Sequence, residues 1–239
     1  MSPTRDPAES PLAALDLLQQ WLARVVPAEG AEWLRGEIER QQLSQDDRRL
    51  AIALGLSPRR VGRADLGLSR DDVVAAQALR PHWRPDTWSS DEAARIALLL
   101  STWRGDEAAF AAIVGRVCET ADLGELVASF KGFAVFPAPE SLYARAREAI
   151  RSSVQPVFEA ISCDNPYPAD YLEEPAYNQM VVKCIFTGVP IERIVGLDER
   201  RNAALASMLR DFASERHAAG RSVPAAVLQW IGEDAHHGE

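Results

Sequence analysis

The stretch Ser89–Trp103, with the sequence SSDEAARIALLLSTW, begins with a helix-capping signal and continues into a segment that is apolar on every side. A serine followed three residues later by a glutamate is typical of a helix N-terminus. A helix without a polar face is covered by other elements all round. Ser89–Trp103 therefore predicts a central helix, and the apolar run Ala108–Val114 predicts a second one.

The rest of the chain also favours helices, with apolar residues spaced by three and four positions. Capping signals are expected at Ser44–Asp47, at Ser69–Asp72 and at Asp122. Further helices are predicted over 141–152, 154–161, 171–187, 202–219 and 223–231. The one strand-like run, Phe133–Phe136, is flanked by prolines and is expected to be an extended connector.

These patterns predict an all-α fold in a single domain over residues 11–232. We expect residues 1–10 to be a flexible lead-in and residues 233–239 a flexible tail. Many short helices with small connectors are typical of stacked helical hairpins, as in HEAT or armadillo arrays. No repeat of fixed period is found, so the predicted HEAT/armadillo-like array is irregular.

Composition excludes several classes of protein. The 239 residues carry 26 Lys and Arg against 35 Asp and Glu, a net charge of −9, which argues against nucleic acid as a partner. No apolar run is long enough to span a membrane, and the polar N-terminus predicts no secretory signal. The three cysteines are expected to be reduced thiols of a cytoplasmic protein.

Motifs of catalysis and cofactor binding are missing from the sequence. There is no glycine-rich dinucleotide or nucleotide loop, no nucleophile elbow, no zinc-protease HExxH and no CxxC pair. We therefore expect no cofactor, no metal site and no catalytic residue of a known type.

Unusual polar residues gather between positions 162 and 202. Asn165-Pro166-Tyr167-Pro168 is predicted to be a non-helical turn, because proline disfavours helical geometry in the residue before it. In the helix that follows, Asn178 lies on the apolar face. Its amide either pins that turn by bonds to the turn's backbone or contacts a ligand, since an unpaired buried amide costs about 1–3 kcal/mol.

The other side of the same helix carries Gln179 and Lys183, and Lys183 is one of two lysines in the chain. We expect any ligand or partner site to include Asn165, Tyr167, Asn178, Gln179 and Lys183, because small-molecule pockets combine a few polar groups with apolar walls.

A basic turn around Arg59 and Arg63 is either a solvated corner or a receptor for an anionic group. The two arginines join the expected site only if the fold brings the first half over the second. Farther along the chain, Asp198 is expected to cap the helix that follows it.

Several motifs in the chain resemble the EboA family. They are Asn165–Pro168, Asn178–Val181 with Lys183, Gly196-Leu197-Asp198-x-Arg200-x-Asn202, Glu215–Arg221, Pro58–Gly62 and Trp88-Ser89 before Ala93–Arg95. The resemblance covers most of the chain and is weakest before residue 45. Tyr177, where the family pattern has tryptophan, and Ser153, where it has asparagine, depart from it.

The resemblance implies a bacterial accessory protein that helps to move a secondary metabolite or its precursor toward the periplasm. It also implies partners: a UbiA-like membrane prenyltransferase and other proteins of the same cluster, with a small metabolite as a further candidate. We expect a non-enzymatic scaffold in the cytoplasm, docked at the inner membrane through a protein partner. The alternative is an enzyme that acts on an isoprenoid- or sugar-like metabolite with Lys183 and a nearby carboxylate.

Overall fold

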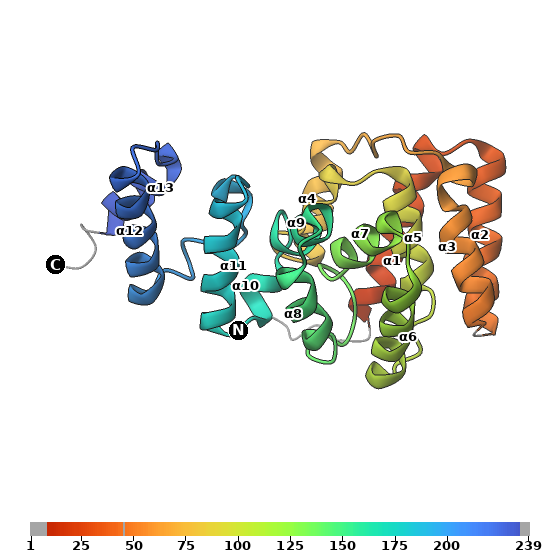
Figure 1. Cartoon of the computed structure of the whole chain (residues 1–239). Helices are drawn as coiled ribbons and strands as arrows, with labels where there is room; N and C mark the ends of the chain where they lie inside the picture. Colours follow the sequence, from red (N-terminus) through yellow and green to blue (C-terminus); the bar gives the residue numbers. More distant parts are fainter. Residues whose placement is uncertain (1–8, 45, 235–239) are drawn as a thin grey trace, which may run out of the picture.

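The computed structural model describes residues 9–44 and 46–234, which form a single helical body (Figure 1). The described residues contain thirteen α-helices and two short 3-10 helices, and no strand. The all-α prediction is therefore confirmed. The predicted lead-in overlaps α1 at Glu9 and Ser10; residues 1–8 and the tail residues 235–239 lie outside the described part.

The helices follow one another with short connections. In the first half they are α1 (Glu9–Val25), α2 (Ala28–Leu43), α3 (Asp47–Val61), α4 (Arg70–Leu79), η1 (Pro85–Thr87), α5 (Ser90–Leu100), α6 (Glu107–Thr120) and α7 (Leu123–Gly132). In the second half they are α8 (Tyr143–Arg151), α9 (Gln155–Ser162), α10 (Tyr167–Tyr171), α11 (Glu174–Phe186), η2 (Ile191–Arg193), α12 (Ala203–Ala218) and α13 (Ala225–Asp234).

Helix α5 is the centre of the first half, as its apolar sequence predicts. It packs against α1, α2, α3 and α7, and every residue from Ala93 to Leu100 is buried. The capping box at its start is present, with Ser89 N donating to Glu92 Oε2 at 2.9 Å. Burial on all sides is possible because the helix buries only one charged pair, Asp91 and Arg95.

The prediction of a second central helix is wrong. Helix α6 packs on α7, and Ala108, Ala109 and Ala112 on its other side are exposed. Alanine is small enough that its exposure costs little, so an alanine-rich run does not need to be covered on both sides. Only residues on one face, such as Phe110 and Ile113, are buried.

Two predictions about helix ends also need correction. Ser44 ends α2, and the N-cap of α3 is Asp46, which accepts a hydrogen bond from Arg49 N at 3.0 Å. The turn predicted at Asn165–Pro168 becomes helical at Tyr167, where α10 starts. Proline is tolerated in the first turn of a helix, because the N–H groups there have no partner within the helix.

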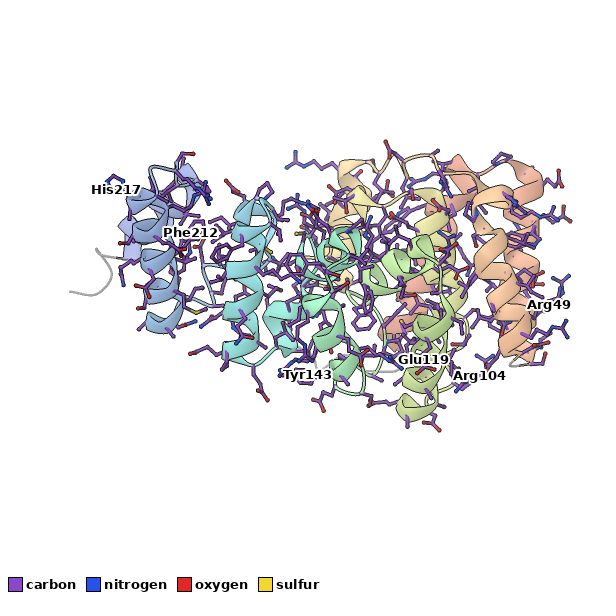
Figure 2. All side chains as sticks on the ribbon, viewed as in Figure 1. Arg49, Arg104, Glu119, Tyr143, Phe212 and His217 are labelled. Carbon is purple, nitrogen blue, oxygen red and sulfur yellow. The ribbon has the colours of Figure 1, made fainter. Side chains whose placement is uncertain are left out.

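The second half continues away from α5 as a succession of packed helices (Figure 1). Helix α9 contacts α7 and α8, α11 contacts α8 and α12, and α12 contacts α13. Figure 2 shows Arg49 on α3 near one end of this body and Phe212 on α12 near the other. The body is therefore elongated, with the first and last helices far apart.

Candidate functional site

A cavity of about 190 Å³ lies where the two halves of the chain meet. We call it the central cavity and define it by Trp88, Lys131, Glu159, Asp164, Asn165 and Arg193. Trp88 comes from the segment before α5 and Lys131 from α7, whereas the others come from α9, the loop after it and η2. The cavity thus joins residues that are up to about a hundred positions apart in the sequence.

Asn165 is placed by three hydrogen bonds and is almost fully buried. Its Nδ2 donates to the carbonyls of Phe130 and Ala160 at 2.9 and 3.1 Å, and its Oδ1 accepts from Tyr167 N at 3.0 Å. These bonds tie the start of α10 to the ends of α7 and α9. Asn165 therefore builds the wall of the central cavity and has one acceptor bond and two donor bonds already satisfied.

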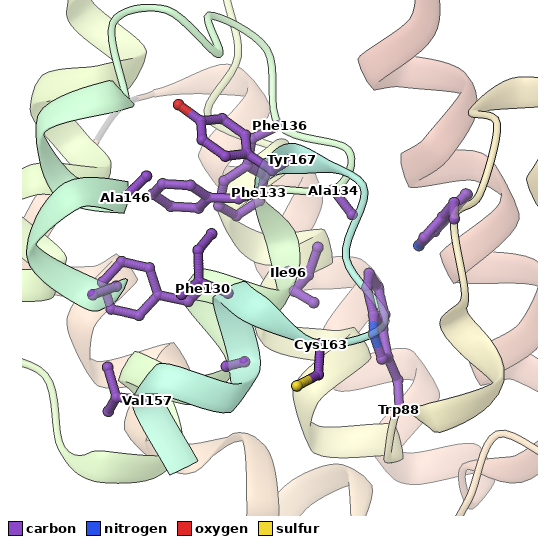
Figure 3. Packing of buried hydrophobic residues seen from close by; sticks show 14 of the residues in the cluster. Trp88, Ile96, Phe130, Phe133, Ala134, Phe136, Ala146, Val157, Cys163 and Tyr167 are labelled. Atoms are coloured by element: carbon purple, nitrogen blue, oxygen red, sulfur yellow. The ribbon is translucent and has the colours of Figure 1, made fainter. Parts of the chain in front are cut away.

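Tyr167 belongs to the apolar core and does not line the central cavity. Its ring lies 5.3 Å from that of Phe133 and 5.0 Å from that of Tyr171, and its hydroxyl donates to Pro139 O at 2.5 Å (Figure 3). Burial raises the pKa of the phenol well above its usual range. Of the predicted pair, Asn165 lies at the cavity and Tyr167 packs behind it.

The charged rim of the central cavity is cross-linked through Arg193. Its Nη1 donates to Glu159 Oε2 at 2.7 Å and its Nε to Asp164 Oδ2 at 3.0 Å. Arg193 O also accepts from Asp164 N at 2.8 Å, and Arg84 lies 3.4 Å from the other oxygen of that carboxylate. Burial opposes ionisation of Glu159, but hydrogen bonds from Gln155 and Arg193 outweigh it and lower the pKa of this carboxyl.

Lys131 supplies the second cation. Its ammonium group contacts both carboxylate oxygens of Glu92, at 2.8 and 2.7 Å, and donates to Thr87 O at 3.3 Å. Glu92 is itself held by the capping box of α5. The position of Lys131 is therefore fixed by the same signal that starts the central helix.

Lys183 lies on α11 and does not line the central cavity. Its ammonium group caps the C-terminus of helix α8. Its Nζ donates to the carbonyls of Ile150 and Ser152 at 2.9 and 2.7 Å and lies 4.2 Å from the centre of the Phe158 ring. Burial lowers the pKa of this ammonium group. A cation at the C-terminus of a helix satisfies carbonyls that have no partner within the helix.

Asn178 and Gln179 differ in their surroundings. The Asn178 amide is buried and exchanges two hydrogen bonds of 3.0 Å with the Asn202 amide, so it does not reach the Asn165–Pro168 segment. Asn202 is also the N-cap of α12, the role that was expected of Asp198. Gln179 is exposed on α11 and does not line the central cavity.

The structure does not bring Arg59 and Arg63 to this region. Both are exposed at the end of α3, which lies at the opposite side of the body from α11 (Figure 1). Arg63 lies 3.7 Å from Asp91, and its side chain is largely exposed. The basic turn is therefore a separate feature of the surface.

A family model described as metabolite traffic protein EboA matches residues 14–232 of the chain. The chain belongs to the EboA family. No curated protein and no solved structure matches the chain. The family match agrees with the resemblance carried by the motifs, whose residues at 165, 178, 183 and 202 all have defined bonding roles in the fold.

Two structural features bear on the chemistry of this EboA protein. Within residues 9–44 and 46–234, no group of three or more His, Cys, Asp or Glu side chains is arranged to hold a metal ion. In the same part of the chain, no helix combines the length and the apolar character needed to cross a bilayer.

The thiols of Cys163 and Cys184 interact, and this hydrogen bond and burial raise the pKa of the Cys184 thiol far above its usual range.

Sequence reasoning missed four charged residues of the central cavity: Lys131, Glu159, Asp164 and Arg193. One signal was available, since Lys131 is one of only two lysines in a chain that otherwise uses arginine. The other three lie on unremarkable polar positions of short elements. Their grouping depends on how η2 packs beside the end of α9, which no local pattern reveals.

Proposed function

We propose that this EboA protein is a non-enzymatic accessory protein in metabolite traffic that works with a UbiA-like membrane prenyltransferase. The observation that carries the proposal is the family match over residues 14–232. The proposed place of action is the cytoplasmic face of the inner membrane, reached through the protein partner. A net charge of −9 disfavours direct attachment to anionic lipid, so a protein partner is needed for docking there.

The elongated succession of α8, α9, α11, α12 and α13 supports a scaffold role. We propose that these helices act as an irregular HEAT/armadillo-like stack, whose side-by-side helices offer a long surface to other proteins. Phe186 and Leu228 are large apolar residues exposed in this part of the chain.

The bonding of Lys183 disfavours the alternative enzyme. A lysine that acts as a base or nucleophile needs a free amine and a path to its substrate. The Lys183 ammonium group instead donates to two carbonyls of the α8 terminus and lies against Phe158. Among the described residues, no carboxylate lies close enough to the Lys183 ammonium group to form an ion pair and share a proton with it.

The test is a complementation experiment in cells that lack this protein and export the pathway metabolite. We expect the parent chain to restore export and to co-purify with the UbiA-like partner when both are produced together. Membrane fractions should retain the chain only when the partner is present. Undiminished export without the chain, or retention on membranes without the partner, contradicts the proposal.

Two variants of Lys183 separate the scaffold from the enzyme. Lys183→Met removes the cap of α8 and should lower the free energy of unfolding by about 1–3 kcal/mol. Lys183→Arg keeps a cation with several N–H donors. If the protein is a scaffold, both variants support export in proportion to the folded protein present. If Lys183 is catalytic, both abolish export even in cells where folded protein is present.

A further inference from the structure

The central cavity has the size of a small ring compound. A cavity of about 150 Å³ is enough to hold benzene. The central cavity, at about 190 Å³ and partly open to solvent, therefore has room for a six-membered ring whose outer hydroxyl groups extend into water. Trp88 forms an apolar part of its lining and is held in place by Trp83, whose ring lies 5.7 Å away.

The charges around the cavity balance. The lining carries two cations, Lys131 and Arg193, and two carboxylates, Glu159 and Asp164. Outside the lining, Glu92 pairs with Lys131 and Arg84 lies 3.4 Å from Asp164, which adds one charge of each sign and keeps the balance. For an anionic ligand, attraction to the cations is offset by repulsion from the carboxylates, and for a cationic ligand the reverse holds, so neither charge gains a net attraction. A charged ligand would also have to break ion pairs of 2.7 and 3.0 Å that already satisfy Arg193. The lining thus favours a neutral molecule.

Both partners of these ion pairs, the arginine and the carboxylates, keep groups that can form further hydrogen bonds. The bonds of Arg193 to carboxylates use Nε and Nη1, so its Nη2 is left to donate. Each carboxylate oxygen has more than one acceptor position, and Asp164 Oδ1 has only the long 3.4 Å contact to Arg84. Donors beside acceptors suit the hydroxyl group, which donates and accepts at once.

From this arrangement we infer that the central cavity is a binding site for a neutral polyhydroxylated ring compound of monosaccharide size. The claim that such a compound binds rests on the cavity alone. The claim that this compound is the transported metabolite rests on the proposed function. Binding to the purified chain tests the first claim independently of export. Absent binding with intact export defeats the inference alone, and binding without any role in export defeats the proposed function alone.

The experiment measures binding of four probes to the full-length chain by calorimetry and by saturation-transfer NMR. The neutral probes are myo-inositol and glucose, the anion is gluconate and the cation is glucosamine. We expect the neutral probes to bind at least about tenfold more tightly than the charged ones. The indole resonance of Trp88, assigned through Trp88→Phe, should shift on binding.

Asp164→Asn is the variant that tests the charge balance. Asp164 has a positive φ of 53°, and asparagine tolerates this conformation as well as aspartate does, so the fold should persist. The variant leaves one excess cation. We expect weaker binding of the neutral probes and stronger binding of gluconate, each by about fivefold or more.

Glu119→Gln is the matched control. It removes a carboxylate that pairs with Arg145 at 2.5 Å on α6 and α8, outside the central cavity, and should change none of the four affinities. Near-UV circular dichroism checks that both variants are folded. The inference is overturned if no neutral probe binds the folded parent at about 10 mM, or if gluconate binds the parent as tightly as the neutral probes do.

Discussion

Asn178 and Asn202 face each other across the junction of α11 and α12, and each amide donates a hydrogen bond of 3.0 Å to the other. Asn202 Oδ1 accepts in addition from Leu205 N at 2.8 Å, which caps α12. The pair therefore links a buried side chain of α11 to the residue that caps the N-terminus of α12. It satisfies the polar groups of a side chain that lies on an apolar face.

The first prediction concerns this pair. Asn178→Leu should lower the free energy of unfolding by about 1–3 kcal/mol, because both hydrogen bonds between the two amides are lost and the half-buried Asn202 keeps only its bonds to Arg200 O and Leu205 N. Urea denaturation followed by tryptophan fluorescence measures the change. Gln179→Leu, on the next residue of the same helix but exposed, is the control and should change stability by no more than about 0.5 kcal/mol. Equal effects of the two substitutions would contradict the role of the amide pair.

The second prediction concerns acid stability. Asp72 accepts hydrogen bonds from Arg24 at 2.8 Å and from the indole of Trp21 at 3.0 Å. The bond from Arg24 and those from Ser69 lower the pKa of Asp72 to about 2. Because the folded-state pKa is below the ordinary value of 3.8, this carboxylate stabilises the fold above that value and loses its contribution as pH falls toward 2.

The measurement is the unfolding free energy of the parent and of Asp72→Asn between pH 7 and pH 2. We expect the variant to be less stable by about 1–2 kcal/mol at pH 7, a value reduced by solvent near the exposed Arg24. The difference should shrink below about pH 4 and vanish near pH 2. A difference that stays constant across this range would show that the Asp72 charge is not the cause.

The third prediction compares two arginines that share one carboxylate. Arg95 is buried, donates to Asp91 at 3.0 Å and donates to Leu54 O at 3.1 Å, which links α5 to α3. Arg63 lies 3.7 Å from the same carboxylate, but its side chain is 74% exposed. Arg95→Leu should cost about 3–5 kcal/mol, because it leaves Asp91 buried with its main partner gone.

Arg63→Leu is the matched control and should cost less than about 1 kcal/mol, as is usual for exposed ion pairs. Thermal unfolding by circular dichroism ranks the two variants. A larger loss for Arg63→Leu would mean that the exposed arginine, and not the buried one, balances Asp91.

How far the sequence predicts this structure depends on the range of the interactions. Local signals located the central helix and three capping boxes, because Ser69, Ser89 and Asp122 bond to residues three positions away. They failed for α6, since exposed alanines do not reveal whether a partner covers them. They also failed for Asn178, whose partner lies 24 positions along the chain.

The candidate site was less accessible to such reasoning. Asn165 was identified because prolines follow it, and it does line the central cavity. Arg193 bonds to Glu159 and Asp164 across 34 and 29 positions, and a spacing of that kind leaves no periodic signal in the sequence. The polarity of Lys183 was equally visible, but only the fold shows that its ammonium group caps α8.

The last prediction concerns two glycines in α2. An added Cβ at Gly30 would collide with the backbone carbonyl oxygen of Arg60 and would lie 2.9 Å from Val26 Cγ1. An added Cβ at Gly36 would meet only the flexible end of Arg40, no closer than 3.5 Å. Both glycines are helical, so substitution by alanine gives each helix position the same gain in propensity, about 0.5–1 kcal/mol.

Gly36→Ala should therefore stabilise the protein by about that amount, whereas Gly30→Ala should destabilise it by about 1–3 kcal/mol, because α2 must move away from the end of α3. Urea denaturation of both variants gives the two signs directly, with the Gly36 variant serving as the control for propensity. Stabilisation by both substitutions would contradict the close approach of α2 and α3 at Gly30. Because α3 also bonds to α5 through Leu54, a shift of α3 should weaken the packing around the central helix as well.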